Sequence, residues 1–126
     1  METKSSNGCG AEGKTRIIYA CSGIGSNVGQ LANAAACRLM NEGYAGGSCL
    51  AGVGGGIAKL VEMGMAADER IVIDGCPAAC AKKIMGDKGF AIDRYVLITD
   101  LGIAKTPGPS FAENDVQHVI DAVKAR

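Results

Sequence analysis

A chain of 126 residues can bury one hydrophobic core without disulfide or metal staples, so its length predicts a single domain. Its 13 basic and 13 acidic side chains cancel to a formal net charge of zero, and no basic run is present to neutralise phosphates, so we expect no nucleic-acid partner. The sequence has neither a signal-peptide pattern nor a long apolar run, which predicts a cytoplasmic protein without a membrane segment.

Glycine and cysteine are the two unusual components of the chain. The 19 glycines are not periodic, which suits tight turns between the short elements of an α/β protein. Six cysteines in a reducing compartment favour metal or thiol chemistry over a disulfide framework. The alternative is that some of them are small buried side chains.

Residues 1–14 are polar and glycine-rich without apolar periodicity, and they predict a flexible tail before a domain that spans residues 15–126. Residues 8–15 match the phosphate-binding loop, in which two glycines flank four residues before Lys and Thr. That loop needs a strand before it and a helix after it. Here a tail comes first and a strand follows, so we do not expect nucleotide binding at this segment.

Short apolar segments alternate with helical patterns along the rest of the chain. We expect strands at residues 16–21, 44–52, 70–74 and 90–99, the second being poor by propensity. Expected helices start at Ser26 or Asn27, at glycines 54–56, at Pro77, and at a capping box formed by residues 110–113. This alternation predicts a three-layer α/β fold with a mostly parallel sheet of about four strands, either Rossmann-like or flavodoxin-like.

The glycine turn after the first strand does not match the dinucleotide fingerprint. Its third glycine comes one residue late, and no acidic residue ends the next strand to hold a ribose. We therefore interpret Gly23 and Gly25 as permitting a sharp turn and a close approach of the backbone to Cys21.

Four cysteines are expected at one edge of the sheet, because parallel strands all end at the same edge. Cys21, Cys49 and Cys76 come at the ends of three strands, and Cys80 lies one helical turn beyond Cys76. Four thiolates can hold zinc tetrahedrally. Cys37 is excluded, since it lies about nine residues, or roughly 13 Å, along a helix that leads away from this edge and should face solvent.

Thiol chemistry without a metal remains open at the same residues. With Pro77 in the first helical position, Cys76 becomes the expected N-cap, and the positive helix end favours thiolates at Cys76 and Cys80. These two could cycle between dithiol and disulfide, or Cys21 could act as a nucleophile with glycine amides behind it. No His–acid partner is evident for such a nucleophile, because His118 is expected to be a surface residue. A module that binds a partner protein is a third option.

Two lysines are expected near the thiols. Lys82 and Lys83 follow Cys80 directly. A cluster of four thiolates around a divalent ion carries a net negative charge, which nearby cations would offset.

The chain resembles the DGC domain family, which is named after its Asp-Gly-Cys motif. The similar segments are Asp74-Gly75-Cys76-Pro77-Ala78-Ala79-Cys80-Ala81-Lys82-Lys83, Cys21-Ser22-Gly23 with Ser26-Asn27-Val28-Gly29-Gln30, and Ser48-Cys49-Leu50-Ala51-Gly52. The resemblance implies a four-cysteine metal site at Cys21, Cys49, Cys76 and Cys80, with no established reaction. Cys9 and Cys37 lie outside the family pattern.

The resemblance and the edge geometry together predict a zinc-binding protein that handles or senses the metal. Iron or an iron–sulfur cluster is the less favoured occupant of the same four thiols. A thiol–disulfide redox protein or a cysteine-dependent enzyme is the alternative.

Overall fold

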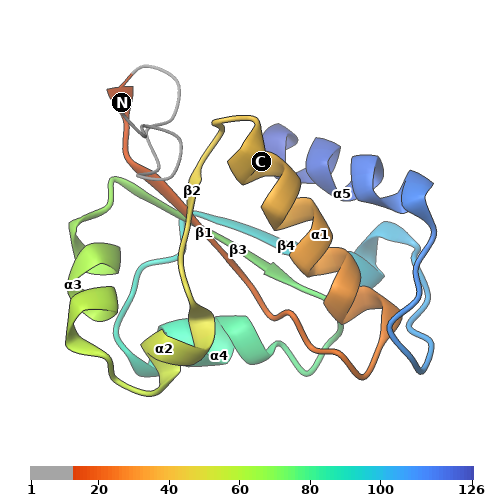
Figure 1. Cartoon of the computed structure of the whole chain (residues 1–126), viewed down its shortest axis with the longest axis horizontal. Coiled ribbons are helices and arrows are strands. Elements are labelled where there is room, and N and C mark those ends of the chain that lie inside the picture. Colours follow the sequence, from red (N-terminus) through yellow and green to blue (C-terminus); the bar gives the residue numbers. More distant parts are fainter. Residues whose placement is uncertain (1–12) are drawn as a thin grey trace.

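Parallel strands form the centre of the computed structural model, which describes residues 13–126 (Figure 1). Within this range the sheet has four strands in the order β2-β1-β3-β4. The strands are β1 Arg16–Ala20, β2 Gly46–Gly47, β3 Glu69–Asp74 and β4 Arg94–Leu97. The helices are α1 Asn27–Asn41, α2 Leu50–Gly54, α3 Ala58–Ala66, α4 Cys80–Asp87 and α5 Glu113–Ala125, with a short 3₁₀ helix, η3, at Ile98–Leu101.

Helices cover both faces of the sheet, so the predicted three-layer α/β fold is confirmed (Figure 1). Because side chains alternate along β1, Ile18 faces α1 and α5, while Ile17 and Tyr19 face the layer that contains α4. The strand order is that of the flavodoxin-like arrangement, in which the chain reverses direction across the sheet between β1 and β3. Ligands of such sheets bind beside that point, outside the carboxyl ends of the strands.

The amino ends of the strands are held together by charge. Glu69, the first residue of β3, accepts hydrogen bonds from Arg16 at 2.8 Å and from Arg94 at 3.2 Å. The guanidinium groups of both arginines also lie over the Tyr44 ring. This cluster is at the opposite end of β3 from Asp74 and Cys76, so it contributes to stability away from the predicted site.

Two sequence predictions for the middle of the chain are wrong in detail. The strand expected over residues 44–52 is only Gly46–Gly47, because glycine brings no side chain to pack and Cys49 already caps α2. The helix expected to open at glycines 54–56 begins later, as α3 at Ala58, after Gly56 with its φ of 78°, and the short helix α2 before these glycines was not predicted.

Two predicted helix starts are also wrong. Helix α4 begins at Cys80 and not at Pro77, with Ala79 as its N-cap in the left-handed region at φ 51°. Helix α5 begins at Glu113 after Ala112, without a side-chain cap, so the expected capping box is not formed. The start of α1 is confirmed, since the Ser26 side chain accepts the Gly29 N–H.

The predicted tail, the phosphate-loop match and Cys9 fall largely or wholly on residues 1–12, outside the described residues. In the part of the chain that is described, no helix combines the length and the hydrophobicity needed to cross a membrane.

Candidate functional site

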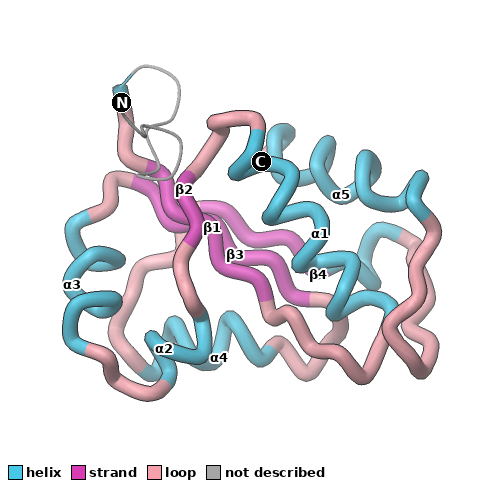
Figure 2. Tube along the Cα trace, viewed as in Figure 1, coloured by secondary structure: helices cyan, strands magenta, loops and turns pink. Residues whose placement is uncertain are grey.

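The loops that follow β1 and β3 leave the same end of the sheet (Figure 2). Cys21 directly follows β1, and its N–H donates to the Ile73 carbonyl of β3 at 3.1 Å, which continues the sheet pairing to the edge. Burial raises the pKa of the Cys21 thiol. The backbone N–H groups of Gly23 and Gly75 act in the opposite direction, and the negative charges of Asp74 and Cys80 add to the rise in pKa.

Asp74 ties the end of β3 to the start of α4. Its buried carboxylate accepts the Ala81 N–H at 2.8 Å, the Lys82 N–H at 2.9 Å and the Tyr95 hydroxyl at 2.9 Å. The side chain that satisfies the first turn of α4 is therefore Asp74 and not Cys76, the predicted N-cap. Because Cys80 is the first residue of α4, these bonds also fix Cys80 relative to the sheet.

Two glycines let the loops pack against each other. A Cβ at Gly75 would lie 2.8 Å from the backbone carbonyl carbon and oxygen of Val28, at the start of α1. A Cβ at Gly29 would lie 2.3 Å from the Gly23 carbonyl oxygen. No side chain fits at either position without displacing backbone. Gly75 therefore sets how closely the loop after β3 approaches α1, and Gly29 sets how tightly the loop after β1 folds against the same helix.

Lys105 lies beside the thiols, and nothing in the sequence indicated this position. Its Nζ donates to Cys76 Sγ at 3.4 Å. Asn27 holds the lysine's loop on both sides, since its amide donates to the Ala104 carbonyl at 2.9 Å and accepts the Thr106 N–H at 2.6 Å. Lys82, one of the two lysines expected near the thiols, lies instead over the Tyr95 ring, with Nζ 5.0 Å from its centroid.

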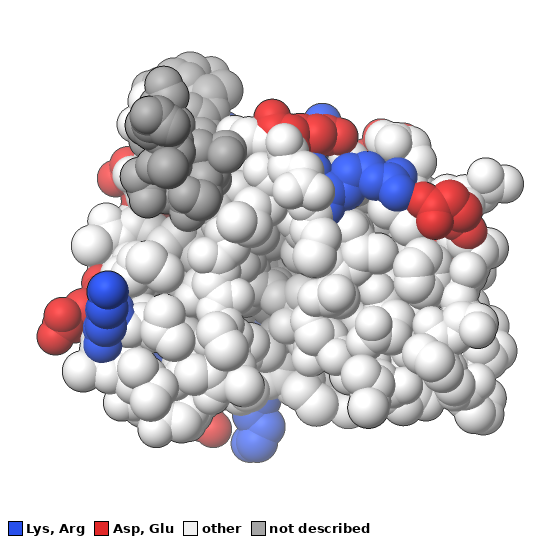
Figure 3. Space-filling model, in the orientation of Figure 1, with Lys and Arg blue, Asp and Glu red and all other residues white. Residues whose placement is uncertain are grey.

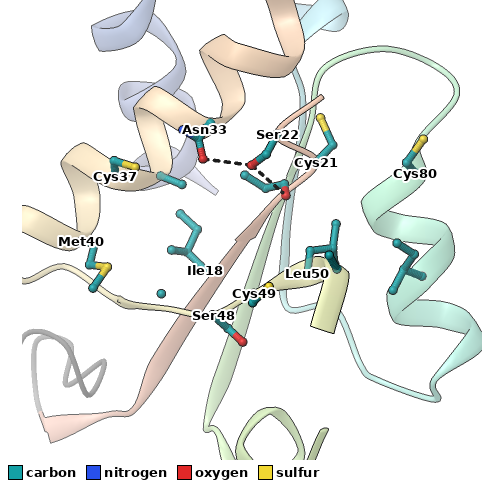
Figure 4. A pocket seen from close by; sticks show the side chains of 15 residues that line it. Ile18, Cys21, Ser22, Asn33, Cys37, Met40, Ser48, Cys49, Leu50 and Cys80 are labelled. Carbon is teal, nitrogen blue, oxygen red and sulfur yellow. Dashed lines mark hydrogen bonds between the residues drawn. The ribbon is translucent and has the colours of Figure 1, made fainter. Parts of the chain in front are cut away.

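Two adjoining pockets lie at this edge. The larger, of about 540 Å³, has Cys21, Cys37, Cys49 and Cys80 in its walls (Figure 4). The smaller, of about 330 Å³, is lined by Cys21, Cys76, Cys80, Lys105 and the glycines of the two loops. Cys21 and Cys80 are therefore shared by both pockets, whereas Cys49 and Cys76 belong to one each.

The four predicted ligands reach one edge but do not form a closed site. Among residues 13–126, no group of three or more Cys, His, Asp and Glu side chains is placed to hold a metal ion. Cys49 Sγ accepts the Gly52 N–H at 3.4 Å within its own turn. The five cysteines in that range are all reduced, and Cys37, Cys49 and Cys80 are exposed.

Cys37 is exposed on α1, as predicted. It also lines the larger pocket, together with residues 47–51, which the sequence did not indicate. Figure 4 places Cys37 on α1 at one side of the pocket and Cys21 and Cys80 at the other. His118 is exposed on α5, as predicted.

Comparison with known proteins identifies the family of the chain. The profile of the DGC domain matches residues 17–123. The chain belongs to the DGC domain family. A relative, the "Anaerobic and virulence modulator AnvM" of Pseudomonas aeruginosa, is 34% identical over 103 residues, which is 82% of this chain and 78% of the relative. No solved structure gives a significant match.

The three residues of the DGC motif have separate roles in this DGC domain. Asp74 binds the start of α4, Gly75 permits contact with α1, and Cys76 places a thiol beside Lys105. The motif therefore arranges the edge of the sheet and contributes one thiol to it.

Proposed function

We propose that the protein binds a soft divalent metal ion, zinc in the first place, reversibly through Cys21, Cys49, Cys76 and Cys80. The ion would be cargo or a signal, and the protein would handle or sense it. The observation that supports this proposal most is the sharing of Cys21 and Cys80 between two pockets whose remaining thiols are Cys76 and Cys49.

The donor chemistry of the edge fits a soft ion. Its candidate ligands are thiols, which zinc and other soft metals prefer. The nearby carboxylate, Asp74, already accepts three hydrogen bonds and is 1% exposed, so it is not offered as a ligand. Lys105 would offset part of the negative charge of a thiolate cluster at Cys76.

The open arrangement favours reversible binding over a structural role. A structural zinc site is closed and contributes folding energy, whereas here the thiols of the described residues are spread over two pockets. Completing the ligand set requires Cys49 and Cys76 to approach each other, because they line different pockets. The segment before Cys49 pairs with the sheet through only two residues, Gly46–Gly47, which leaves the approach to Cys49 lightly held on that side.

Zinc titration of the reduced, metal-free protein tests the proposal. We expect about one equivalent to bind, Cys21→Ser to weaken the affinity by more than about tenfold, and the control His118→Asn to leave it unchanged. Less than about half an equivalent of bound metal, with all four thiols still freely alkylated in the native protein, would refute zinc binding. The visible spectrum of a fresh preparation tests for iron or an iron–sulfur cluster in place of zinc.

Thiol–disulfide exchange is the second candidate, favoured by the common position of Cys21 and Cys80 and by the relative named as an anaerobic modulator. Two protein thiols would give two electrons and two protons to a low-molecular-weight disulfide, forming one protein disulfide and releasing two small thiols. Incubation with oxidised glutathione, followed by peptide mapping, identifies the pair among Cys21, Cys76 and Cys80. A pair that oxidises rapidly and is not protected by zinc would favour this candidate.

A further inference from the structure

The larger pocket has the size and the walls of a small-molecule site. Its volume of about 540 Å³ falls within the usual range of ligand pockets, which is about 300–1,000 Å³. Figure 3 shows a hollow on this face, between α1 and the segment that carries β2 and α2. Apart from the thiols, its walls are mainly aliphatic and include Ile18, Ala20, Ala36, Leu50, Ala51 and Ile84. Such walls favour an apolar ligand.

Charge distinguishes the two pockets at this edge of the sheet. No residue that lines the larger pocket is charged, whereas the smaller pocket contains Lys105. Away from its rim, the face with the larger pocket also shows few charged side chains (Figure 3). An ionised ligand would lose water on entering the larger pocket without meeting an opposite charge. The larger pocket is therefore suited to an uncharged ligand.

One wall of the larger pocket offers a hydrogen-bond donor. Ser22 Oγ donates to Asn33 Oδ1 at 3.0 Å, which fixes the orientation of the Asn33 amide (Figure 4). Among residues 13–126, the amide nitrogen of Asn33, Nδ2, donates to no other residue. A few fixed polar groups in an apolar pocket orient a ligand, and a carbonyl oxygen is an acceptor that matches this donor.

The turn that carries Ser22 is held in an unfavourable conformation. Ser22 has a φ of 55°, in the left-handed region that favours glycine. Two residues of α1 hold it there, because Asn33 accepts the Ser22 hydroxyl and Gln30 Nε2 donates to the Ser22 carbonyl at 3.2 Å. Residues held in such conformations cluster at ligand sites. The conformation of Ser22 therefore supports a functional role for the wall that it forms with Asn33.

We infer that the larger pocket binds an uncharged, mainly apolar small molecule with a carbonyl group, and that Asn33 Nδ2 donates a hydrogen bond to the carbonyl oxygen. This organic ligand is separate from the proposed metal. Its binding requires no metal, because the apolar walls and the donor are present in the chain itself.

Chemical-shift titration of the reduced, metal-free, isotope-labelled protein tests this assignment. The probes are α-tetralone, which is an uncharged bicyclic ketone, tetralin, which lacks the carbonyl, and naphthoate, which is a bicyclic anion. We expect α-tetralone to shift the amide signals of residues 47–51, which line the pocket. It should bind there about fivefold more tightly than tetralin and at least about tenfold more tightly than naphthoate.

Two substitutions examine the walls and the donor separately. Ala36→Leu places a larger side chain in the pocket and should weaken the binding of α-tetralone by more than about tenfold. The matched control Ala66→Leu, on α3 and outside the pocket, should leave the affinity unchanged. Asn33→Ala removes the donor, so this variant should bind α-tetralone and tetralin equally. Unchanged circular dichroism shows that each variant is folded.

Three results would overturn the assignment. They are the absence of any shift at residues 47–51 with α-tetralone, binding of naphthoate in this pocket as tight as that of α-tetralone, and a preference for α-tetralone over tetralin that persists in Asn33→Ala. Because the protein is metal-free throughout, these results do not depend on zinc. Failure of the zinc titration leaves the organic ligand site standing, and failure of the probes leaves the proposed metal site standing.

Discussion

Replacing Asp74 by Asn tests how the DGC motif holds the edge of the sheet. The substitution keeps the shape of the side chain and one acceptor oxygen, but it turns the second oxygen into a donor. That oxygen, Oδ2, accepts both the Lys82 N–H and the Tyr95 hydroxyl. Hydrogen bonds to a charged group contribute roughly 1.5 kcal/mol or more each. In Asp74→Asn the Lys82 N–H loses its acceptor, and the Tyr95 hydroxyl can only accept an uncharged bond from the amide, so the free energy of unfolding should fall by about 3 kcal/mol.

Urea denaturation followed by circular dichroism measures this loss directly. For a chain of this size, 3 kcal/mol corresponds to a melting temperature lower by about 12 °C. Tyr95→Phe removes only one of the three bonds and should cost about 1.5 kcal/mol. The matched control is Asp87→Asn, on an exposed residue at the other end of α4, which should stay within about 0.5 kcal/mol of the wild type.

A result in which Asp74→Asn is as stable as Asp87→Asn would refute this reasoning, because the two bonds to Asp74 Oδ2 would then contribute nothing. The zinc affinity of Asp74→Asn gives a second measurement. Since Asp74 positions Cys80 without being a ligand, we expect the affinity to fall by about tenfold while the stoichiometry stays the same.

Three further predictions concern the same two ends of the sheet. Alanine normally favours a helix, but Gly29→Ala should lower the free energy of unfolding by about 2 kcal/mol, because its Cβ would meet a backbone oxygen. The control Gly25→Ala has nothing within 4 Å of its Cβ and should leave the free energy of unfolding unchanged in the same urea assay. Burial alone would raise the pKa of Glu69, but its two arginine partners outweigh burial and lower it below the ordinary 4.5. The contribution of the Glu69 carboxylate to stability is therefore present above pH 4.5 and is lost as the pH falls through the lowered pKa. Glu69→Gln should flatten the acid side of a curve of unfolding free energy against pH. Burial raises the pKa of the Cys21 thiol above the ordinary 9.0. The contribution of the neutral thiol to stability is therefore present below pH 9 and is lost as the pH rises through the raised pKa. In the metal-free protein, the alkylation of Cys21 should accelerate only at a higher pH than the alkylation of free cysteine.

The architecture could be predicted from local patterns because it follows from alternation. The buried stripes of α1 and α5 have the expected helical spacing, with Leu31 and Ala35 in one and Val116 and Ile120 in the other. Parallel strands then bring Cys21 and Cys76 to one edge whatever the details of the loops. The α/β class and the parallel sheet are confirmed for this reason, whereas the family is confirmed by the profile match.

The features that were missed depend on contacts between distant residues. The start of α4 is set by Asp74, which lies six residues before Cys80 in another element, so the local Cys-Pro pattern gave the wrong helix start. Lys105 reaches Cys76 because Asn27 binds its loop from 77 and 79 residues away in the chain. Cys37 was placed on the correct side of its helix, but only the position of α2 shows that this side forms a pocket wall.

Strand β3 joins two very different environments, with the arginine-bound Glu69 at its beginning and the thiol-bearing loop at its end. The anchoring charges are thus remote from the thiols, so a change of side chain at the thiol-bearing loop leaves the anchor intact. The part of the domain that holds the strands together is thereby kept separate from the part that meets a ligand.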